Sequence, residues 1–150
     1  MVDFLLIGPE TVVQYNNCFR LIRDHKMFYG FKRDRGHMVF DYIDGYEIDV
    51  KQIRWFQNLI DVPPDPLVLR KVYKDGDYRR FDDMPDVINV DRVEDIPVDY
   101  EGVIGVPITF YRHWNPGQFE LLDMKKKGCV VDGVPRFVRL LIRRKDIKKI

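Results

Sequence analysis

The chain has 150 residues, of which 45% are hydrophobic and 33% are charged, and this composition is typical of globular rather than disordered proteins. Its formal net charge of +1 provides no overall attraction to nucleic acid, so any DNA contact requires a local basic patch. The sequence shows no membrane-spanning run, no signal peptide and no ligand spacing of a metal site. We therefore expect a single cytoplasmic domain over residues 1–150, with Cys18 and Cys129 as free thiols.

The first elements predict a β-α-β unit. Phe4–Ile7 is a continuous apolar run that ends at Gly8 and Pro9, which is typical of a buried parallel strand. A short strand is expected at Met27–Phe31. Between these strands, apolar residues recur at helical spacing, namely Val12, Tyr15, Phe19 and Ile22. This order predicts a right-handed crossover that joins two strands paired in parallel.

The rest of the chain predicts antiparallel strands. An Asp44-Gly45 turn suits a hairpin between Met38–Ile43 and Tyr46–Val50. Pro107, inside an apolar run, indicates an edge strand or a bulge, and Pro97, Pro107 and Pro116 argue against any helix in that region. The further expected strands are Ile53–Leu59, Val68–Tyr73, Val87–Val90, Val103–Phe110, and the last hairpin of Phe119–Lys126 and Phe137–Arg143. We therefore expect an α+β fold in which one β-α-β unit precedes a mostly antiparallel sheet.

Four segments, in this order, resemble the C-terminal portion of the EcoRI-type adenine-specific DNA methyltransferases. They are DFLLIG at Asp3–Gly8, IRWFQNL at Ile53–Leu59, DVINVDRVEDIPVDYEGVIGVPITFYRHWNPGQF at Asp86–Phe119, and RFVRLLIRRK at Arg136–Lys145. No single motif is a strong fingerprint, but the ordered set covers nearly the whole chain. Pro9 stands where the family has an asparagine after Ile-Gly, which removes that side chain from any role it has in the family.

The resemblance implies that this chain corresponds to a part of the family enzyme that does not contain the catalytic residues. The family's catalytic Asn-Pro-Pro-Phe and its glycine-rich cofactor turn do not occur in these 150 residues. We therefore expect no catalytic residue and no cofactor bound by this chain alone, although the complete family enzyme uses S-adenosylmethionine. As a partner, the resemblance implies a complementary methyltransferase half.

Two aromatic residues are candidates for base stacking. Trp55 and Phe56 follow one another on a strand, and an aromatic from this region of adenine methyltransferases can stack on a base turned out of the duplex. Packing in the core is the alternative for both, and the sequence does not separate them.

Basic and polar residues in three further segments are candidates for DNA contacts. A polar loop follows Gly30, a second loop follows Phe110, and a lysine run precedes the last turn. The alternatives are solvated loops, a packed turn and the protection of a sheet edge. For the lysine run and Arg143–Lys145, on paired strands, a single basic patch is one alternative, and solubility with protection of a sheet edge is the other. The candidate residues are Lys32, Arg33, Arg35, Arg112, Trp114, Asn115, Lys125, Lys126 and Lys127.

The sequence leaves two functions open. The first is the target-recognition portion of an adenine-specific DNA methyltransferase, inactive by itself, with double-stranded DNA and a complementary half as partners. The second is a non-enzymatic module of a mobile element that binds DNA or protein, acting as a decoy or as an inhibitor of a restriction or defence system. Because Phe4–Ile7 would have an uncovered edge in a detached half, we expect either a homodimer or a rearranged packing of Val12–Arg23 over that edge.

Overall fold

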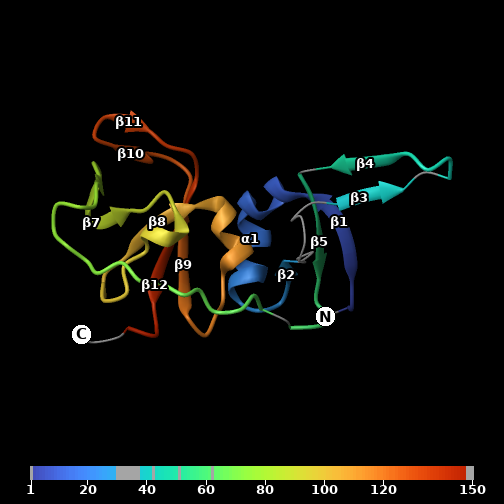
Figure 1. The fold of residues 1–150 in the computed structure, drawn as a ribbon, viewed down its shortest axis with the longest axis horizontal. Coiled ribbons are helices and arrows are strands. Elements are labelled where there is room, and N and C mark those ends of the chain that lie inside the picture. Colours follow the sequence, from blue (N-terminus) through green and yellow to red (C-terminus); the bar gives the residue numbers. More distant parts are fainter. Residues whose placement is uncertain (1, 30–37, 42, 51, 62, 148–150) are drawn as a thin grey trace. The chain divides into compact units, whose positions relative to one another are not determined.

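The structure is a computed structural model that describes residues 2–29, 38–41, 43–50, 52–61 and 63–147. Its contacts divide the chain into two compact units, Met1–Val62, coloured blue to green in Figure 1, and Pro63–Ile150, coloured green to red. Both units contain strands, and the expectation of a mixed α+β protein is confirmed. The expectation of a single domain stays a prediction.

The first unit contains a three-stranded sheet in the order β1-β5-β2, formed by Leu5–Pro9, Ile53–Gln57 and Phe28–Tyr29. The prediction that the first two strands pair with each other is wrong, because β5 lies between them and pairs antiparallel with both. The two strands still run in the same direction, and the connection between them includes η1 (Glu10–Gln14) and α1 (Asn16–Arg23). β5, which is distant in the sequence, therefore forms the backbone hydrogen bonds with β1 and β2 that the local pattern predicted these two strands to form with each other.

One side of this sheet is apolar and exposed. Leu5, Ile7 and Trp55 point to the same side, since Ile7 pairs with Trp55 and side chains alternate along a strand. Their exposed fractions are 54%, 48% and 36%, so the prediction of a buried first strand is wrong. Phe56 points to the other side and is only 3% exposed. The strand is apolar as expected, but it lies at the edge of the sheet.

A separate hairpin joins β3 (Met38–Asp41) and β4 (Glu47–Val50), as predicted. The last pair in its register is Asp41 with Glu47, so the connection is longer than the two-residue turn expected at Asp44 and Gly45. Gly45 has a φ of +82°, a conformation in which glycine is favoured.

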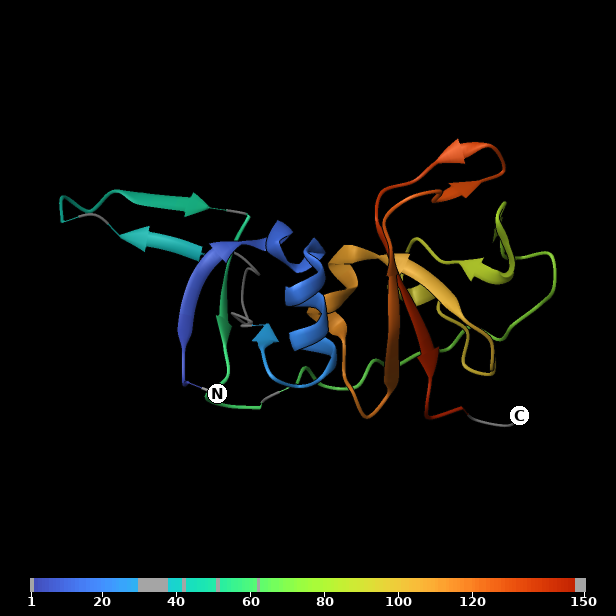
Figure 2. The same ribbon diagram turned by 180° about the vertical axis from the view of Figure 1, so that it is seen from behind.

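The second unit contains a seven-stranded sheet in the order β11-β10-β6-β7-β8-β12-β9, which is mostly antiparallel as expected. Its one parallel pair among the described residues joins β7 and β8, through Ile88 with Ile104 and Asn89 with Gly105. Figure 2 shows the long strands β9 and β12 of this unit side by side. The strands are β6 (Arg80–Phe81), β7 (Met84–Asn89), β8 (Ile104–Pro107), β9 (Phe119–Lys125), β10 (Val130–Val131), β11 (Val134–Pro135) and β12 (Arg139–Arg144).

Three local expectations in this unit are corrected. Val68–Tyr73 forms no strand. Pro107 ends β8, which is an interior strand rather than an edge. Short 3₁₀ helices form at η2 (Val93–Asp95) and at η3 (Ile108–His113). Pro107 is compatible with η3, since a proline that precedes the first helical residue costs no helical hydrogen bond.

A buried cluster under the sheet holds Phe81, Val87, Cys129, Val131 and Leu141. Both Cys18 and Cys129 are free thiols, as expected. The turn at Asp132 and Gly133 has two positive φ values, 51° and 73°, which the type I′ turn of a hairpin requires. The carboxylate of Asp82 accepts hydrogen bonds from both turn amides, over 2.9 and 3.0 Å.

Candidate nucleic-acid interface

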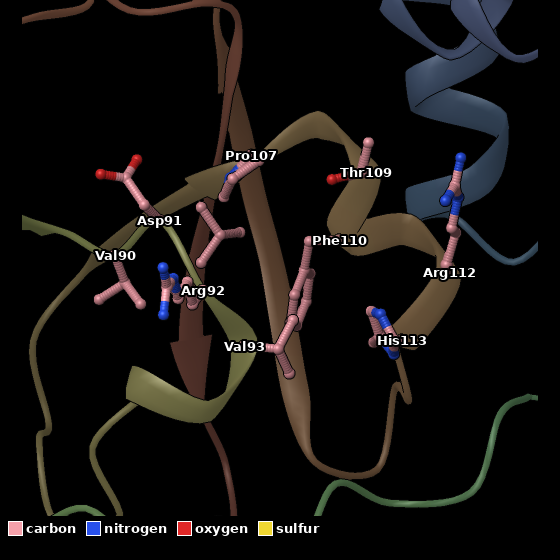
Figure 3. A pocket seen from close by; sticks show the side chains of 10 residues that line it. Val90, Asp91, Arg92, Val93, Pro107, Thr109, Phe110, Arg112 and His113 are labelled. Atoms are coloured by element: carbon pink, nitrogen blue, oxygen red, sulfur yellow. The ribbon is translucent and has the colours of Figure 1, made fainter.

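A pocket lies where the two parallel strands of the second unit end. Val90–Val93 follow β7, and η3 follows Pro107, the last residue of β8. Both connections therefore leave the same end of the parallel pair. The residues of these connections line a pocket of about 100 Å³, shown in Figure 3. Ligand sites in sheets with parallel strands are commonly found at this position, beyond the carboxyl ends of the strands.

The polar side chains of the pocket are mostly hydrogen-bond donors. Arg92, Thr109, Arg112 and His113 can all donate, whereas Asp91 is the single carboxylate of the lining. Asp91 Oδ1 accepts a hydrogen bond from Nη2 of Arg139 over 2.6 Å, and this ion pair balances its charge. Arg92 is exposed and makes no ion pair within the described part of the chain. The pocket therefore presents net positive charge.

His113 contributes to this pocket as a neutral group at pH 7. Burial lowers the pKa of His113 below its ordinary value of 6.5, and the positive charge of Arg112 lowers it further. A neutral imidazole keeps one N–H donor and one acceptor nitrogen. The fixed cations of the lining are therefore the two arginines, Arg92 and Arg112.

The loop after η3 uses its polar atoms within the protein. Asn115 Nδ2 donates to the carbonyl oxygen of Pro64 over 2.7 Å, and Asn115 Oδ1 accepts from the amide of Gly117 over 2.8 Å. Trp114 Nε1 donates to the carbonyl oxygen of Phe119 over 3.1 Å. These bonds favour the packed-turn alternative for Trp114 and Asn115, while their contact with DNA stays a prediction.

The lysine run lies at the end of β9. Lys125 Nζ is 2.5 Å from Asp83 Oδ2, and the Lys125 side chain is only 10% exposed, whereas Lys126 and Lys127 are exposed. The run does not meet Arg143–Lys145, because the register pairs Lys125 with Arg139 and places Arg144 opposite Phe119, at the other end of the two strands. The register therefore excludes the alternative of one basic patch from both segments, since antiparallel strands bring opposite ends together.

The remaining candidates belong to the first unit. Trp55 is 36% exposed, whereas Phe56 is 3% exposed, so of the two rings only that of Trp55 has substantial access to solvent. Base stacking by either residue stays a prediction. Lys32, Arg33 and Arg35 lie outside the described residues.

Sequence reasoning missed Arg92 and Thr109. Arg92 lies in the segment from Asp91 to Asp99, whose other charged residues are acidic. The average charge of this segment is therefore negative and gives no sign of a basic site. Its position just after the apolar run Val87–Val90 was the available signal, because residues after a strand commonly reach a site. The sequence did not show that β7 pairs with β8, and this pairing brings Thr109 near Arg92.

Two searches of the described residues gave negative results. No helix there is long and apolar enough to cross a membrane. No cluster of three or more histidine, cysteine, aspartate or glutamate side chains suited to a metal ion occurs in that part of the chain.

Comparisons with known proteins match the chain to one enzyme family over nearly its whole length. The family model described as "Adenine-specific methyltransferase EcoRI" matches residues 2–147. The chain is 32% identical to the type II methyltransferase M.EcoRI of Escherichia coli over 168 residues, which cover 97% of this chain and 51% of that protein. It is 31% identical to the type II methyltransferase M.MpnI of Mycoplasma pneumoniae over 184 residues, which cover 96% of this chain and 57% of that protein.

A third relative, the type II methyltransferase M.MgeORF184P of Mycoplasma genitalium, is 28% identical over 185 residues, covering 97% of this chain and 58% of that protein. The chain thus spans about half the length of the curated relatives it matches. No solved structure matches it.

Proposed function

The chain belongs to the EcoRI family of adenine-specific DNA methyltransferases, and we propose that its 150 residues form the DNA-contacting, target-recognition portion of such an enzyme. The match over residues 2–147 carries this proposal. We assign the resembling segments to the C-terminal portion of the family. The complete enzyme would transfer a methyl group from S-adenosylmethionine to the exocyclic amine of adenine, after that base has been turned out of the duplex.

We assign the catalytic and cofactor-binding residues to sequence outside these 150 residues, because neither Asn-Pro-Pro-Phe nor the glycine-rich turn occurs within them. The pocket beside η3 does not fit S-adenosylmethionine. Its volume of about 100 Å³ is well below the roughly 300 Å³ at which ligand sites of that size begin. The role we assign to this chain is the binding and positioning of DNA.

The exposed side of the first sheet supports a protein partner for this chain. Leu5 and Ile7, on one side of the edge strand β1, form an exposed apolar surface, and such surfaces usually mark contact sites. Since the relatives are about twice as long as the chain, we propose that the complementary methyltransferase half covers this surface. Without that half, two copies of the chain are expected to associate through it.

Two measurements on the purified chain test the main proposal. Fluorescence anisotropy with a labelled duplex should show binding that weakens steeply as salt is added. Labelled S-adenosylmethionine should transfer no methyl group to the same duplex. Absence of binding at low salt would contradict the role in DNA contact, whereas clear methyl incorporation would contradict the assignment of the catalytic residues to other sequence.

Light scattering over a range of concentrations tests the apolar surface. The chain should associate as its concentration rises, and Ile7→Lys should abolish that association by placing a charge at the edge strand. Val68→Lys is the matched control, because Val68 is an exposed valine, at 81%, in the other unit. Equal behaviour of both variants and the parent chain would remove this surface from the proposal.

A further inference from the structure

We propose that the pocket between η2 and η3 binds a phosphate group of the DNA backbone, with Arg92, Thr109 and His113 as donors and Arg112 as a second source of positive charge. This inference rests on the proposed function, since it names the part of the DNA that one described site would contact. It is independent of Trp55 and of the lysine run.

The first argument is the donor chemistry of the lining. Figure 3 shows Arg92 on one side of Phe110 and His113 on the other, so both connecting segments contribute a donor to the lining. The one carboxylate, Asp91, is already bound by Arg139. A site with donors and no free acidic group favours a ligand that carries negative charge and accepts hydrogen bonds.

The second argument is the charge of the surrounding segment. η2 is acidic, but Asp95 forms an ion pair with Lys71 over 3.2 Å and Glu94 is not among the lining residues. The guanidinium of Arg92 is exposed and has no ion-pair partner in the described part of the chain, although carboxylates adjoin it in the sequence. An external anion would therefore meet a cation that no internal group neutralises.

The third argument is the size of the pocket. A volume of about 100 Å³ is well below the roughly 300 Å³ at which sites for drug-sized ligands begin. This space suits a phosphate group and excludes a nucleoside or a nucleotide cofactor. The guanidinium group also matches the geometry of phosphate oxygens, with which it can form paired hydrogen bonds.

The test compares variants of the full 150-residue chain in anisotropy titrations with a labelled duplex at several salt concentrations. Arg92→Gln should weaken binding about tenfold at low salt and reduce the slope of log affinity against log salt by about one unit. Thr109→Val should weaken binding without changing that slope, because it removes a hydroxyl and no charge. Arg70→Gln is the control, since it removes the same charge from an exposed arginine outside the pocket.

The outcomes separate this inference from the proposed function. If the parent chain binds no duplex, the proposed function fails and this inference fails with it. If the parent chain binds and Arg92→Gln behaves like Arg70→Gln, only the pocket assignment is overturned. A titration with inorganic phosphate at constant ionic strength, followed by NMR at the His113 ring, shows whether the pocket binds free phosphate. If the parent chain binds free phosphate and Arg92→Gln leaves the DNA affinity unchanged, the assignment to the DNA backbone is overturned.

Discussion

Arg139 on β12 holds Asp91, the second residue after β7, through a hydrogen bond of 2.6 Å between Nη2 and Oδ1. The Arg139 side chain is 7% exposed and that of Asp91 is 49% exposed, so a buried guanidinium reaches outward to a carboxylate near the surface. Burial lowers the pKa of Arg139, and Asp91 acts in the opposite direction. This pair anchors the segment that presents Arg92 to the pocket.

Asp91→Asn should destabilise the chain. The substitution leaves the buried charge of Arg139 with a weaker partner, and its Nε already lacks a hydrogen bond in the structure. The expected loss in the free energy of unfolding is about 2 kcal/mol, measured by urea denaturation. Arg139→Met in the same background should recover part of the loss, because no buried charge remains. An unchanged urea midpoint in Asp91→Asn would show that solvent already satisfies this arginine.

Gly105→Ala should be among the most damaging single substitutions in the second unit. Gly105 pairs with Asn89 and with Leu141, and an added Cβ would lie 2.6 Å from Cζ of the buried Phe81 ring. Overpacking of this kind costs about 1–3 kcal/mol, which a thermal melt would detect. Gly8→Ala is the control, since a Cβ there meets the Phe56 ring at an ordinary 3.7 Å. Equal melting temperatures for the two variants would contradict the close packing of Phe81 on Gly105.

His113 should make stability fall on acidification. Its pKa in the folded chain lies below the ordinary value of 6.5, so the unfolded chain binds the proton more tightly. The stability contributed by the neutral imidazole is therefore complete above pH 6.5 and is lost as the pH falls toward the lower, folded pKa. Urea midpoints between about pH 7.5 and 5.5 should show a smaller decline in His113→Gln than in the parent chain. His25→Gln, which changes an exposed histidine, is the control.

Trp55 and Phe56 should respond differently to substitution by alanine. Phe56→Ala should lose about 3–5 kcal/mol of stability, because Phe56 is 3% exposed. Trp55→Ala should stay folded and bind an intact duplex normally, but bind a duplex with an unpaired adenine more weakly, by about 1–3 kcal/mol. Anisotropy with the two duplexes measures this difference. A Trp55→Ala chain that unfolds would assign this tryptophan to the core instead.

Lys127 and Lys125 should differ in their effect on the salt dependence of DNA binding. Lys127 is exposed, so Lys127→Ala should reduce the salt slope by about 0.9 if this lysine meets a phosphate. Lys125 is bound to Asp83, so Lys125→Ala should change the slope little. Sequence preference should be unchanged in both variants. The opposite order of the two slopes would indicate that the ion pair opens to admit DNA.

Features that depend on neighbouring residues were predictable from the sequence. The turn at Asp132 and Gly133 follows from the positive φ values that these two residue types tolerate. The hairpin of β3 and β4 follows from the Asp44-Gly45 pair between two strand-like runs. The ordered segments between Asp3 and Lys145 also sufficed to predict the methyltransferase family. Each of these inferences uses local stereochemistry or the identity and order of residues, which the sequence states directly.

Features that depend on partners far apart in the chain were decided only by the tertiary structure. The insertion of β5 between β1 and β2, the parallel pairing of β7 with β8, and the bond between Asp91 and Arg139 join segments that local patterns do not connect. The physical reason is that every strand offers the same backbone donors and acceptors, whatever its side chains. The sequence of one apolar strand therefore does not determine which strand it pairs with. Packing selects the neighbour, and through the pairing of β7 with β8 it brings Arg92 and His113 into one pocket.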